Sequence, residues 1–325
     1  MNVVSLFSGA GGLDLGFEQS GFHVIWANEY DSTIWETYEL NFPNTILDKR
    51  NIKDISASEI PFADGIIGGP PCQSWSEAGA GRGINDKRGQ LFYDYIRLLK
   101  ERQPKFFLAE NVSGILHPKH KQAFTNIINE FKNAGYVISC KLLNANDYDV
   151  PEDRLRVIIV GYQKKLKKKF EFPKAQSHKP VLKDAIFDLR LAKPAKNNNK
   201  TNGDELKIPN HEYMNGGFSS SYMSRNRVRS WDEPSFTIQG GGRHAPIHPQ
   251  APKMKFIEQN IRIFVPGKEK LYRRLSVREC ARIQTFPDGF IFKYHDIADG
   301  YKMVGNAVAV NFAKHLAKKI YLDIQ

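Results

Sequence analysis

The sequence predicts an α/β fold, with a doubly wound, mostly parallel sheet and a second, smaller unit rich in loops. In the first 160 residues, short apolar runs alternate with segments of helical periodicity, as in strands joined by helical crossovers. The composition changes near residue 163, and from there to about 270 the chain is rich in Gly, Pro, Ser, Asn and Arg. Helical periodicity returns at 277–284 and 307–321. We therefore assign 1–172 and 298–325 to the sheet domain, and 173–297 to a second domain and its hinge.

Each element of the sheet domain follows from local patterning. Apolar, β-branched runs predict strands at residues 3–7, 23–27, 65–67, 105–109 and 157–160. Helical spacing of apolar residues predicts helices at 13–20, 31–41, 91–102 and 122–134. The lysine-rich run at 163–169 is typical of a solvated linker or a hairpin turn.

Composition narrows the class of protein. The chain has 325 residues, 41% of them hydrophobic, which excludes a wholly disordered protein. No apolar run approaches the roughly 18–20 residues that span a membrane, and the N-terminus lacks the basic region of a secretory signal. Three widely spaced cysteines exclude a disulfide framework and a Cys-x-x-Cys zinc site, and they fit a reducing cytoplasm. The net charge of +12 suggests an anionic partner such as nucleic acid.

A glycine-rich turn follows the first predicted strand directly. Ser8-Gly9-Ala10-Gly11-Gly12 would let backbone N–H groups approach a ligand. The dinucleotide fingerprint G-x-G-x-x-G would need glycine at position 14, which is Asp14, so a pyrophosphate ligand is disfavoured. Glu29 ends the second strand, where an acidic residue commonly binds ribose hydroxyls. The pattern indicates an adenosine-type cofactor, although a tight turn and a capping acid remain an alternative.

A cysteine follows the strand at 65–67 through the stiff turn Gly68-Gly69-Pro70-Pro71-Cys72-Gln73. This places Cys72 at the carboxyl edge of the sheet, where ligands bind in such folds, and its thiolate could act as a nucleophile. The polar, glycine-containing segment at 74–89 has the character of a lid. The alternative for Cys72 is a small buried hydrophobe, which is the expectation for Cys140 and Cys280.

Six motifs together resemble those of the cytosine-5 DNA methyltransferases, in order and in approximate spacing along essentially the whole chain. The second unit is similar to that of the HaeIII-type enzymes, which modify GGCC, in its Ser224–Arg229 segment, Trp231, Pro234, Phe236-Thr237, Gly242-Arg243 and His248–Pro252. The six motifs are Phe7 to Gly12, Pro70-Pro71-Cys72-Gln73, Glu110-Asn111-Val112, Arg154-Leu155-Arg156, Arg273 to Pro287, and Gly305-Asn306-Ala307-Val308.

The resemblance implies S-adenosyl-L-methionine as cofactor, with S-adenosyl-L-homocysteine as product. It places Phe7 near the adenine and Glu29 on the ribose. The family's adenine-binding Asp corresponds to Asn51 here, whose amide oxygen can still accept the hydrogen bond; Asp54 is the alternative if the loop register differs. The full implied cofactor set is Phe7, Ser8, Gly9, Ala10, Gly11, Glu29, Tyr30, Asn51, Ile52, Pro71, Leu91, Asn306, Ala307 and Val308.

The resemblance also implies the chemistry. Cys72 would attack C6 of a cytosine flipped out of duplex DNA, Glu110 would bind N3, Arg156 would hold O2, and Arg154 would orient Glu110 or a phosphate. Arginines commonly read guanine, and we expect Arg225, Arg227 and Arg243 to do so here. Thr237 and Ile238 would support the vacated base stack or the DNA backbone, and Ser76 and Arg82 in the lid would contact DNA.

Two residues depart from the family pattern, Glu152 in place of Gln and Ala309 in place of Pro. We expect a monomeric, cytoplasmic, bacterial enzyme without metal or membrane attachment, paired functionally with a restriction endonuclease. An RNA cytosine-5 methyltransferase and a catalytically silent DNA-binding module are the alternatives. An NAD-dependent oxidoreductase is disfavoured by the glycine pattern and by the Pro-Pro-Cys-Gln turn.

Overall fold

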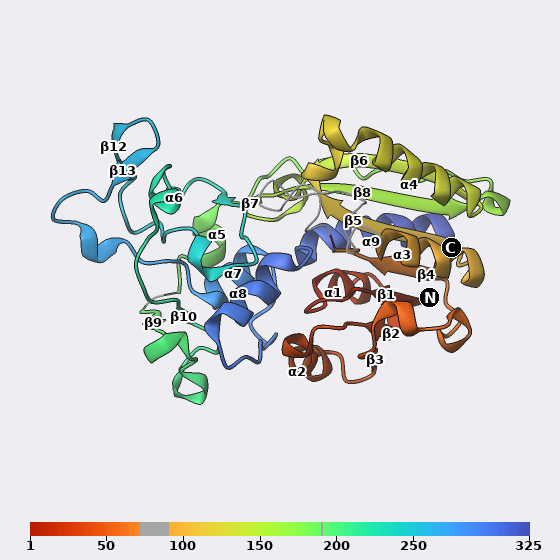
Figure 1. Ribbon diagram of the computed structural model, residues 1–325, viewed down its shortest axis with the longest axis horizontal. Helices are drawn as coiled ribbons and strands as arrows, with labels where there is room; N and C mark the ends of the chain where they lie inside the picture. Colours follow the sequence, from red (N-terminus) through yellow and green to blue (C-terminus); the bar gives the residue numbers. More distant parts are fainter. Residues whose placement is uncertain (72–90, 190) are drawn as a thin grey trace. The chain divides into compact units, whose positions relative to one another are not determined.

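The computed structural model describes residues 1–71, 91–189 and 191–325, which belong to two compact units (Figure 1). The first unit comprises Met1–Asn144, Leu155–Ala175 and Phe312–Gln325, and the second comprises Ala145–Arg154 and Gln176–Asn311. The predicted boundaries differ from this division at three places. Residues 145–154 and 298–311, predicted in the sheet domain, belong to the second unit, and residues 173–175, predicted in the second domain, belong to the first unit.

A seven-stranded sheet forms the centre of the first unit, in the order β3-β2-β1-β4-β5-β8-β6. All its neighbouring strands pair in parallel except β8, which runs antiparallel to both β5 and β6. This confirms the predicted mostly parallel sheet and its five predicted strands, and adds β3 and β6. The strands are β1 (Asn2–Leu6), β2 (His23–Asn28), β3 (Ile46–Asp48), β4 (Gly65–Gly68), β5 (Phe106–Val112), β6 (Tyr136–Asn144) and β8 (Leu155–Gln163).

Two consecutive phenylalanines of β5 show that helices cover both faces of the sheet. Phe106 packs with Phe17 of α1 and with Phe22, which precedes β2, whereas Phe107 stacks on Phe131 of α4 with ring centroids 4.5 Å apart. Successive side chains of a strand point to opposite faces, so both faces are buried against helices. The helices of this unit are α1 (Gly12–Glu18), α2 (Ser32–Asn41), α3 (Leu91–Arg102), α4 (Lys121–Asn133) and most of α9 (Val310–Ile324).

The second unit consists mainly of loops joined by short elements, as predicted. Its two-stranded sheets pair β9 with β10, β7 with β11, and β12 with β13. The predicted helix at 277–284 is present as α7, while α8 was not predicted. The elements are β7 (Glu152–Asp153), α5 (Leu182–Ile186), β9 (Lys193–Pro194), β10 (Glu212–Tyr213), α6 (Ser220–Met223), β11 (Ser235–Phe236), β12 (Lys255–Glu258), β13 (Ile261–Ile263), α7 (Val277–Ile283) and α8 (Ile297–Asn306).

The lysine-rich run at 163–169 forms a turn, as expected, with Lys167 in the left-handed conformation. Cys280 lies buried in α7, and burial raises the pKa of its thiol well above the usual value. No helix in the described part of the chain has the length and apolar character needed to cross a membrane.

We predict that Gly161→Ala destabilises the sheet. A Cβ added at Gly161 in β8 would lie 2.1 Å from Cε1 of Phe107, whose ring is held between α4 and Tyr136. The expected loss in free energy of unfolding is about 1–3 kcal/mol, measured by urea denaturation. Gly289→Ala, where no atom lies within 4 Å of the added Cβ, is the control and should change stability little. Equal stability of the two variants would contradict the packing described.

Candidate active site

The carboxyl ends of five parallel strands lie along one edge of the sheet, and the predicted site residues of the first unit follow these ends. Phe7 follows β1, Glu29 follows β2, Asn51 lies beyond β3, Gly69 follows β4, and Glu110 lies near the end of β5. In sheets of this kind, ligands bind at the carboxyl edge. The topology therefore brings together residues that are up to about 100 positions apart in the sequence.

The glycine-rich loop forms a tight turn that is stabilised by backbone hydrogen bonds. Ser8 N donates to Asn28 O of β2, and Gly11 N donates to Ser8 O. Gly9 and Gly11 have φ values of 55° and 86°, and Phe7 also has a positive φ of 55°. That conformation is an outlier for a bulky residue, and such strain is concentrated at functional sites.

Glu29 braces this loop from the neighbouring strand. Its Oε2 accepts from Gly9 N at 2.9 Å, and its Oε1 accepts from Asp31 N at 2.7 Å. Burial raises the pKa of Glu29, while the two backbone donors act in the opposite direction. The next residue, Tyr30, is 67% exposed. Glu29 thus lies where the sequence predicts, but its carboxylate already organises the loop.

Asn51 begins a short 3-10 turn, Ile52–Asp54, and its Oδ1 accepts from Lys53 N. Asn28 Nδ2 donates to the Asp48 and Arg50 carbonyls before it, while Arg97 of α3 donates to the Ile52 and Ile55 carbonyls after it. The Ile52 side chain belongs to the buried core of the sheet. Asn28 and Arg97 were not predicted as site residues, because only the tertiary fold brings them to this loop.

Glu110 and Arg156 form an ion pair at the same edge. Arg156 Nε lies 2.8 Å from Glu110 Oε1, and each side chain is only 11% exposed. A Cβ added at Gly69 would lie 3.3 Å from Glu110 Oε2, and Asn111 Nδ2 donates to Pro70 O. The turn that leads to the predicted nucleophile therefore lies against the predicted acid.

Of the other predicted residues on either side of the segment 72–90, the structure describes Pro71 and Leu91. Pro71, half-buried, ends the described part of the turn, and Leu91 begins α3. Cys72, Ser76 and Arg82 lie outside the described residues.

Arg154, predicted to orient Glu110 or a phosphate, is held by backbone carbonyls of the second unit. Its guanidinium is buried in the second unit, where it donates to the carbonyls of Ile238, Gly305 and Ala307 at 2.8–2.9 Å. Glu152 lies 3.5 Å away. The arginine that pairs with Glu110 is Arg156, and Arg154 instead joins the segment at Ile238 to the end of α8.

The predicted cofactor residues Asn306, Ala307 and Val308 also lie in the second unit, at the end of α8. Asn306 is exposed, whereas Ala307 and Val308 are buried. A Cβ added at Gly240 would meet Asn306 Oδ1 at 2.4 Å, and one added at Gly305 would meet the Gln239 backbone at 2.2 Å. Two glycines thus allow these loops to pack closely. A role of 306–308 in cofactor binding stays a prediction.

The residues predicted to contact DNA differ in accessibility. Arg225 and Arg243 are exposed, as base-reading arginines require. Arg227 donates to the Tyr222 and Ser221 carbonyls and lies over the Tyr222 ring. Thr237 Oγ1 donates to Asp153 O, and the Ile238 side chain is 1% exposed, so it packs inside the unit rather than at an open surface.

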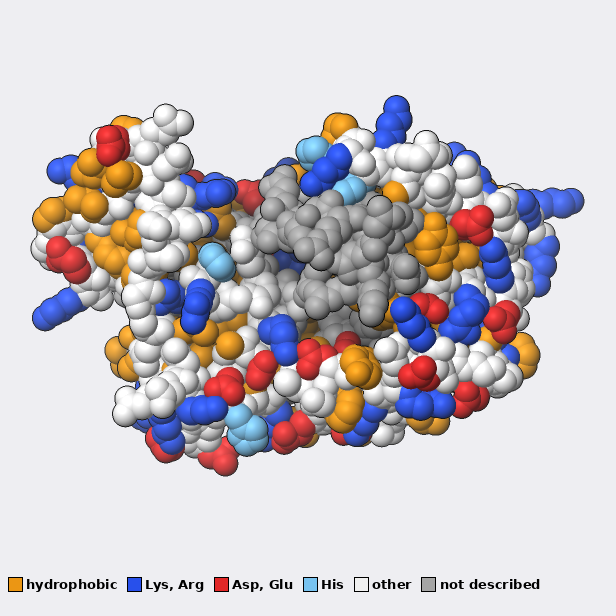
Figure 2. Space-filling view, viewed as in Figure 1, with side chains coloured by type: hydrophobic (Ala, Val, Ile, Leu, Met, Phe, Trp, Pro, Cys, Tyr) orange, Lys and Arg blue, Asp and Glu red, His pale blue; other side chains and the backbone are white. Residues whose placement is uncertain are grey.

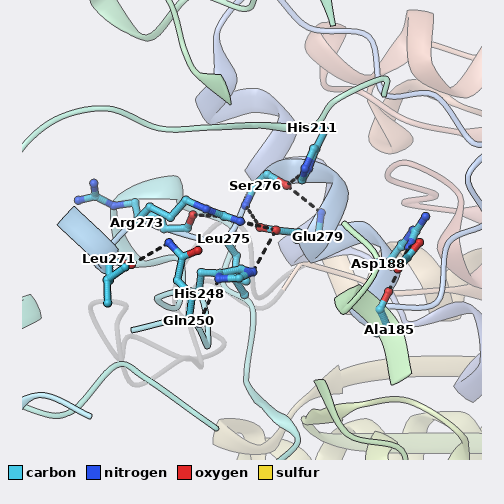
Figure 3. Close-up of polar contacts among 12 residues, drawn as sticks. Ala185, Asp188, His211, His248, Gln250, Leu271, Arg273, Leu275, Ser276 and Glu279 are labelled. Carbon is cyan, nitrogen blue, oxygen red and sulfur yellow. Dashed lines mark hydrogen bonds and ion pairs between the residues drawn. The ribbon is translucent and has the colours of Figure 1, made fainter. Parts of the chain in front are cut away.

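A buried charge network organises the second unit around Glu279 of α7 (Figure 3). Arg273 donates to both carboxylate oxygens at 2.7 Å, and Ser276 N donates to Oε2. His248 Nε2 lies 3.5 Å from Oε1, and His211 Nδ1 lies 2.9 Å from Ser276 Oγ. Burial raises the pKa of Glu279, but the Arg273 pair outweighs it and leaves the pKa below its usual value. The sequence motif at 273–287 is thus a structural centre of this unit.

The overall positive charge does not by itself mark a binding surface. Figure 2 shows Lys and Arg side chains scattered over both units on the face in view, with acidic side chains among them. On this face, the overall charge therefore indicates no DNA-binding patch, and specific DNA recognition would depend on individual arginines.

The strand order and the loops at the carboxyl edge define the class of α/β methyltransferases. The structure is similar to that of a prophage-encoded E. coli protein described as a DNA modification methyltransferase, with a TM-score of 0.75, 26% identity, and coverage of 100% of this chain and 99% of the other. The fold is also that of the methyltransferase EhMeth of Entamoeba histolytica, with a TM-score of 0.69, 18% identity, and coverage of 100% and 99%.

The sequence comparisons show the family. The model of the C-5 cytosine-specific DNA methylases matches residues 1–322, and this chain belongs to that family. It is 59% identical over 324 residues to the type II methyltransferase M.FnuDI of Fusobacterium nucleatum, covering 98% of this chain and 94% of the relative. It is 57% identical over 325 residues to the type II methyltransferase M.MthTI of Methanothermobacter thermautotrophicus, covering 100% and 98%. The chain is a DNA (cytosine-5-)-methyltransferase of the restriction–modification type, and its family uses S-adenosylmethionine.

We predict that Glu279→Gln destabilises the protein by about 3–5 kcal/mol at pH 7.5, because it leaves the buried Arg273 without its charge partner. The pKa of Glu279 is lower folded than unfolded, where it is about 4.3. Its stabilisation is therefore present above that unfolded value and is lost as the pH falls through the folded pKa. Urea denaturation at several pH values measures the difference from the native chain.

The exposed Glu258→Gln is the matched control for this prediction, and it should change the free energy of unfolding little. A loss for Glu279→Gln no larger than that of the control would contradict the role of the network.

Proposed function

We propose that this enzyme flips a cytosine out of duplex DNA and methylates its C5 through a covalent adduct between Cys72 and C6, at the sequence GGCC. The observation that carries the proposal is the Glu110–Arg156 pair, 2.8 Å apart at the carboxyl edge and against the Gly69-Pro70 turn that leads to Cys72. The GGCC site rests on the likeness of the second unit to the HaeIII-type enzymes. We also propose that the methylation protects DNA from a partner restriction endonuclease.

The residues of the glycine loop fit S-adenosylmethionine, which supplies an electrophilic methyl group on a sulfonium. No atom lies within 4 Å of a Cβ added at Gly9, so a ligand can approach the backbone there. Ser8 Oγ is buried and has no hydrogen-bond partner among the described residues. We propose that Glu29 holds the ribose and Asn51 the adenine, with Phe7 against the adenine ring.

The chemistry follows from the weak nucleophilicity of cytosine C5. The Cys72 thiolate adds to C6, which forms a C–S bond and moves electron density onto C5, N3 and O2. Glu110 hydrogen-bonds N3, and Arg156 both positions Glu110 and stabilises the charge on O2. After methyl transfer, a base such as water removes the C5 proton, the C–S bond breaks and the ring regains its aromaticity.

Base flipping is required because stacking covers C6 inside a duplex. The exposed Arg225 and Arg243 are the better candidates for reading guanine O6 and N7, since Arg227 already donates to two carbonyls. The other lysines and arginines would supply affinity that does not depend on sequence.

Cys72→Ala should abolish methyl transfer while the protein still binds cofactor. The native chain should form a covalent complex with a GGCC duplex containing 5-fluorocytosine, because fluorine at C5 prevents the final elimination. Gel electrophoresis under denaturing conditions detects that complex. Cys140→Ala is the control, since Cys140 lies on β6, which β8 separates from β5 and Glu110, and it should react as the native chain does. Undiminished transfer by Cys72→Ala would exclude the covalent mechanism.

Bisulfite sequencing of plasmid DNA from expressing cells tests the recognition sequence. We expect methylation at GGCC, and we expect Arg243→Ala to lower it about tenfold or more, the loss typical of one bidentate guanine contact. The exposed Lys268→Ala serves as a control for a general loss of positive charge. Methylation at another sequence would reject the GGCC assignment, and labelled methyl transfer to tRNA but not to duplex DNA would favour an RNA substrate.

A further inference from the structure

Asp14 is a fully buried carboxylic acid in the first turn of α1, directly after the glycine loop. Its Oδ1 accepts from Ser5 Oγ of β1 at 2.6 Å, and its Oδ2 accepts from Tyr38 Oη of α2 at 2.6 Å. One carboxylate therefore links three elements. The mechanism proposed above does not use it, and the sequence alone marks it only as the absence of a glycine.

The elements that Asp14 links are those that carry the cofactor loop. Ser5 lies two residues before Phe7, and Asp14 lies three residues after Gly11. Tyr38 stacks on Phe42 with ring centroids 4.6 Å apart, and a Cβ added at Gly11 would lie 2.2 Å from the Phe42 ring. The end of α2 thus supports the loop twice, through the Tyr38–Asp14 hydrogen bond and through Phe42 against Gly11.

We propose that Asp14 is a positioning residue for the cofactor: its ionised carboxylate, by accepting from Ser5 and Tyr38 together, holds loop 8–11 in the conformation that binds S-adenosylmethionine. This rests on the proposed cofactor site. An ionised carboxylate accepts at both oxygens with full strength, whereas protonation turns one of them into an O–H donor and a weaker acceptor for Ser5 or Tyr38.

The ionisation of Asp14 falls in an accessible pH range. Burial raises its pKa to about 7, against the lowering effect of the Ser5 and Tyr38 hydrogen bonds, and Glu18 on the same helix adds a small increase. Burial also raises the pKa of Tyr38 well above its usual value, so Tyr38 remains a donor. From β1 the group that faces Asp14 is the Ser5 hydroxyl.

Folding therefore favours the protonated form of Asp14, whereas the proposed cofactor binding favours the ionised form. Because its pKa is raised on folding, the stability it contributes is present at low pH and is lost as the pH rises through about 7. Cofactor binding requires the same ionisation that costs stability. A residue with a merely structural role would change stability and affinity in the same direction.

The test compares Asp14→Asn and Tyr38→Phe with the native chain by calorimetric titration with S-adenosylmethionine between pH 6 and 8.5, together with KM, kcat and urea denaturation. For Asp14→Asn at pH 8 we expect Kd and KM for the cofactor to rise about tenfold, as for loss of one hydrogen bond to a charged group. We expect kcat at saturation within about twofold, and stability at least equal to the native value. Its Kd should also lose the native pH dependence.

Tyr38→Phe keeps the acid and removes one donor, so the pH midpoint of cofactor affinity should move upward. It also keeps the proposal testable if Asp14→Asn does not fold. Glu36→Gln neutralises an exposed acid on α2 and should leave the native profile unchanged. A native Kd and pH profile in Asp14→Asn or in Tyr38→Phe would overturn the role of Asp14 alone. No cofactor binding by the native chain would overturn the proposed site as well.

Discussion

Parallel pairing of the strands with almost no stagger is the constraint on which the site depends. Leu6 of β1 pairs with Asn28 of β2 and with Gly68 of β4, and Gly68 pairs with Ala109 of β5. The residues that follow this row, Phe7, Glu29, Gly69 and Glu110, therefore lie at one level, about 5 Å from strand to strand. The antiparallel β8 adds Arg156 from the opposite chain direction. Because Glu110 faces Ile158, Arg156 lies diagonally beside Glu110 on the same side of the sheet.

The second unit has no large sheet among its described residues, and buried arginines stabilise it by hydrogen-bonding the carbonyls of its loops. Arg274 donates to the carbonyls of Gly216 and Gly217, and Arg278 donates to those of Pro209 and Phe290. A guanidinium has five donors in a fixed plane, so one side chain can satisfy carbonyls of several loops that no strand partner reaches. Part of the net charge of +12 is therefore structural, and the arginines available to DNA are fewer than the composition suggests.

Sequence patterns predict those strands and site residues that depend on local composition. They do not predict contacts that depend on segments far apart in the chain. The buried parallel strands, and Glu29 and Glu110 after them, could be located because continuous apolar runs end just before an acid. The strand β6 was not among the predicted strands because its residues Cys140 to Leu142 are exposed and include a lysine, which breaks the apolar run. The expectation that Cys140 is buried is therefore wrong, whereas that for Cys280 is confirmed. Arg154 and Arg156 have the spacing of one strand face, yet the chain passes from one unit to the other between Arg154 and Leu155. No local pattern could reveal that.

The contacts of Glu152, two residues before Arg154, explain how the chain accommodates an acid where the resemblance to the family predicts Gln. Glu152 Oε1 accepts from Ile238 N at 2.6 Å, a bond that a Gln side-chain oxygen could also make. The extra charge lies 3.5 Å from Arg154 in a buried setting, where an unpaired carboxylate would be costly. Arg154 in turn donates to the Ile238 carbonyl, so both side chains hold the same residue of the loop. Glu152 and Arg154 therefore act together to hold the loop at Ile238. The replacement of Gln by Glu152 affects this loop, whereas the Glu110–Arg156 ion pair is formed by other residues.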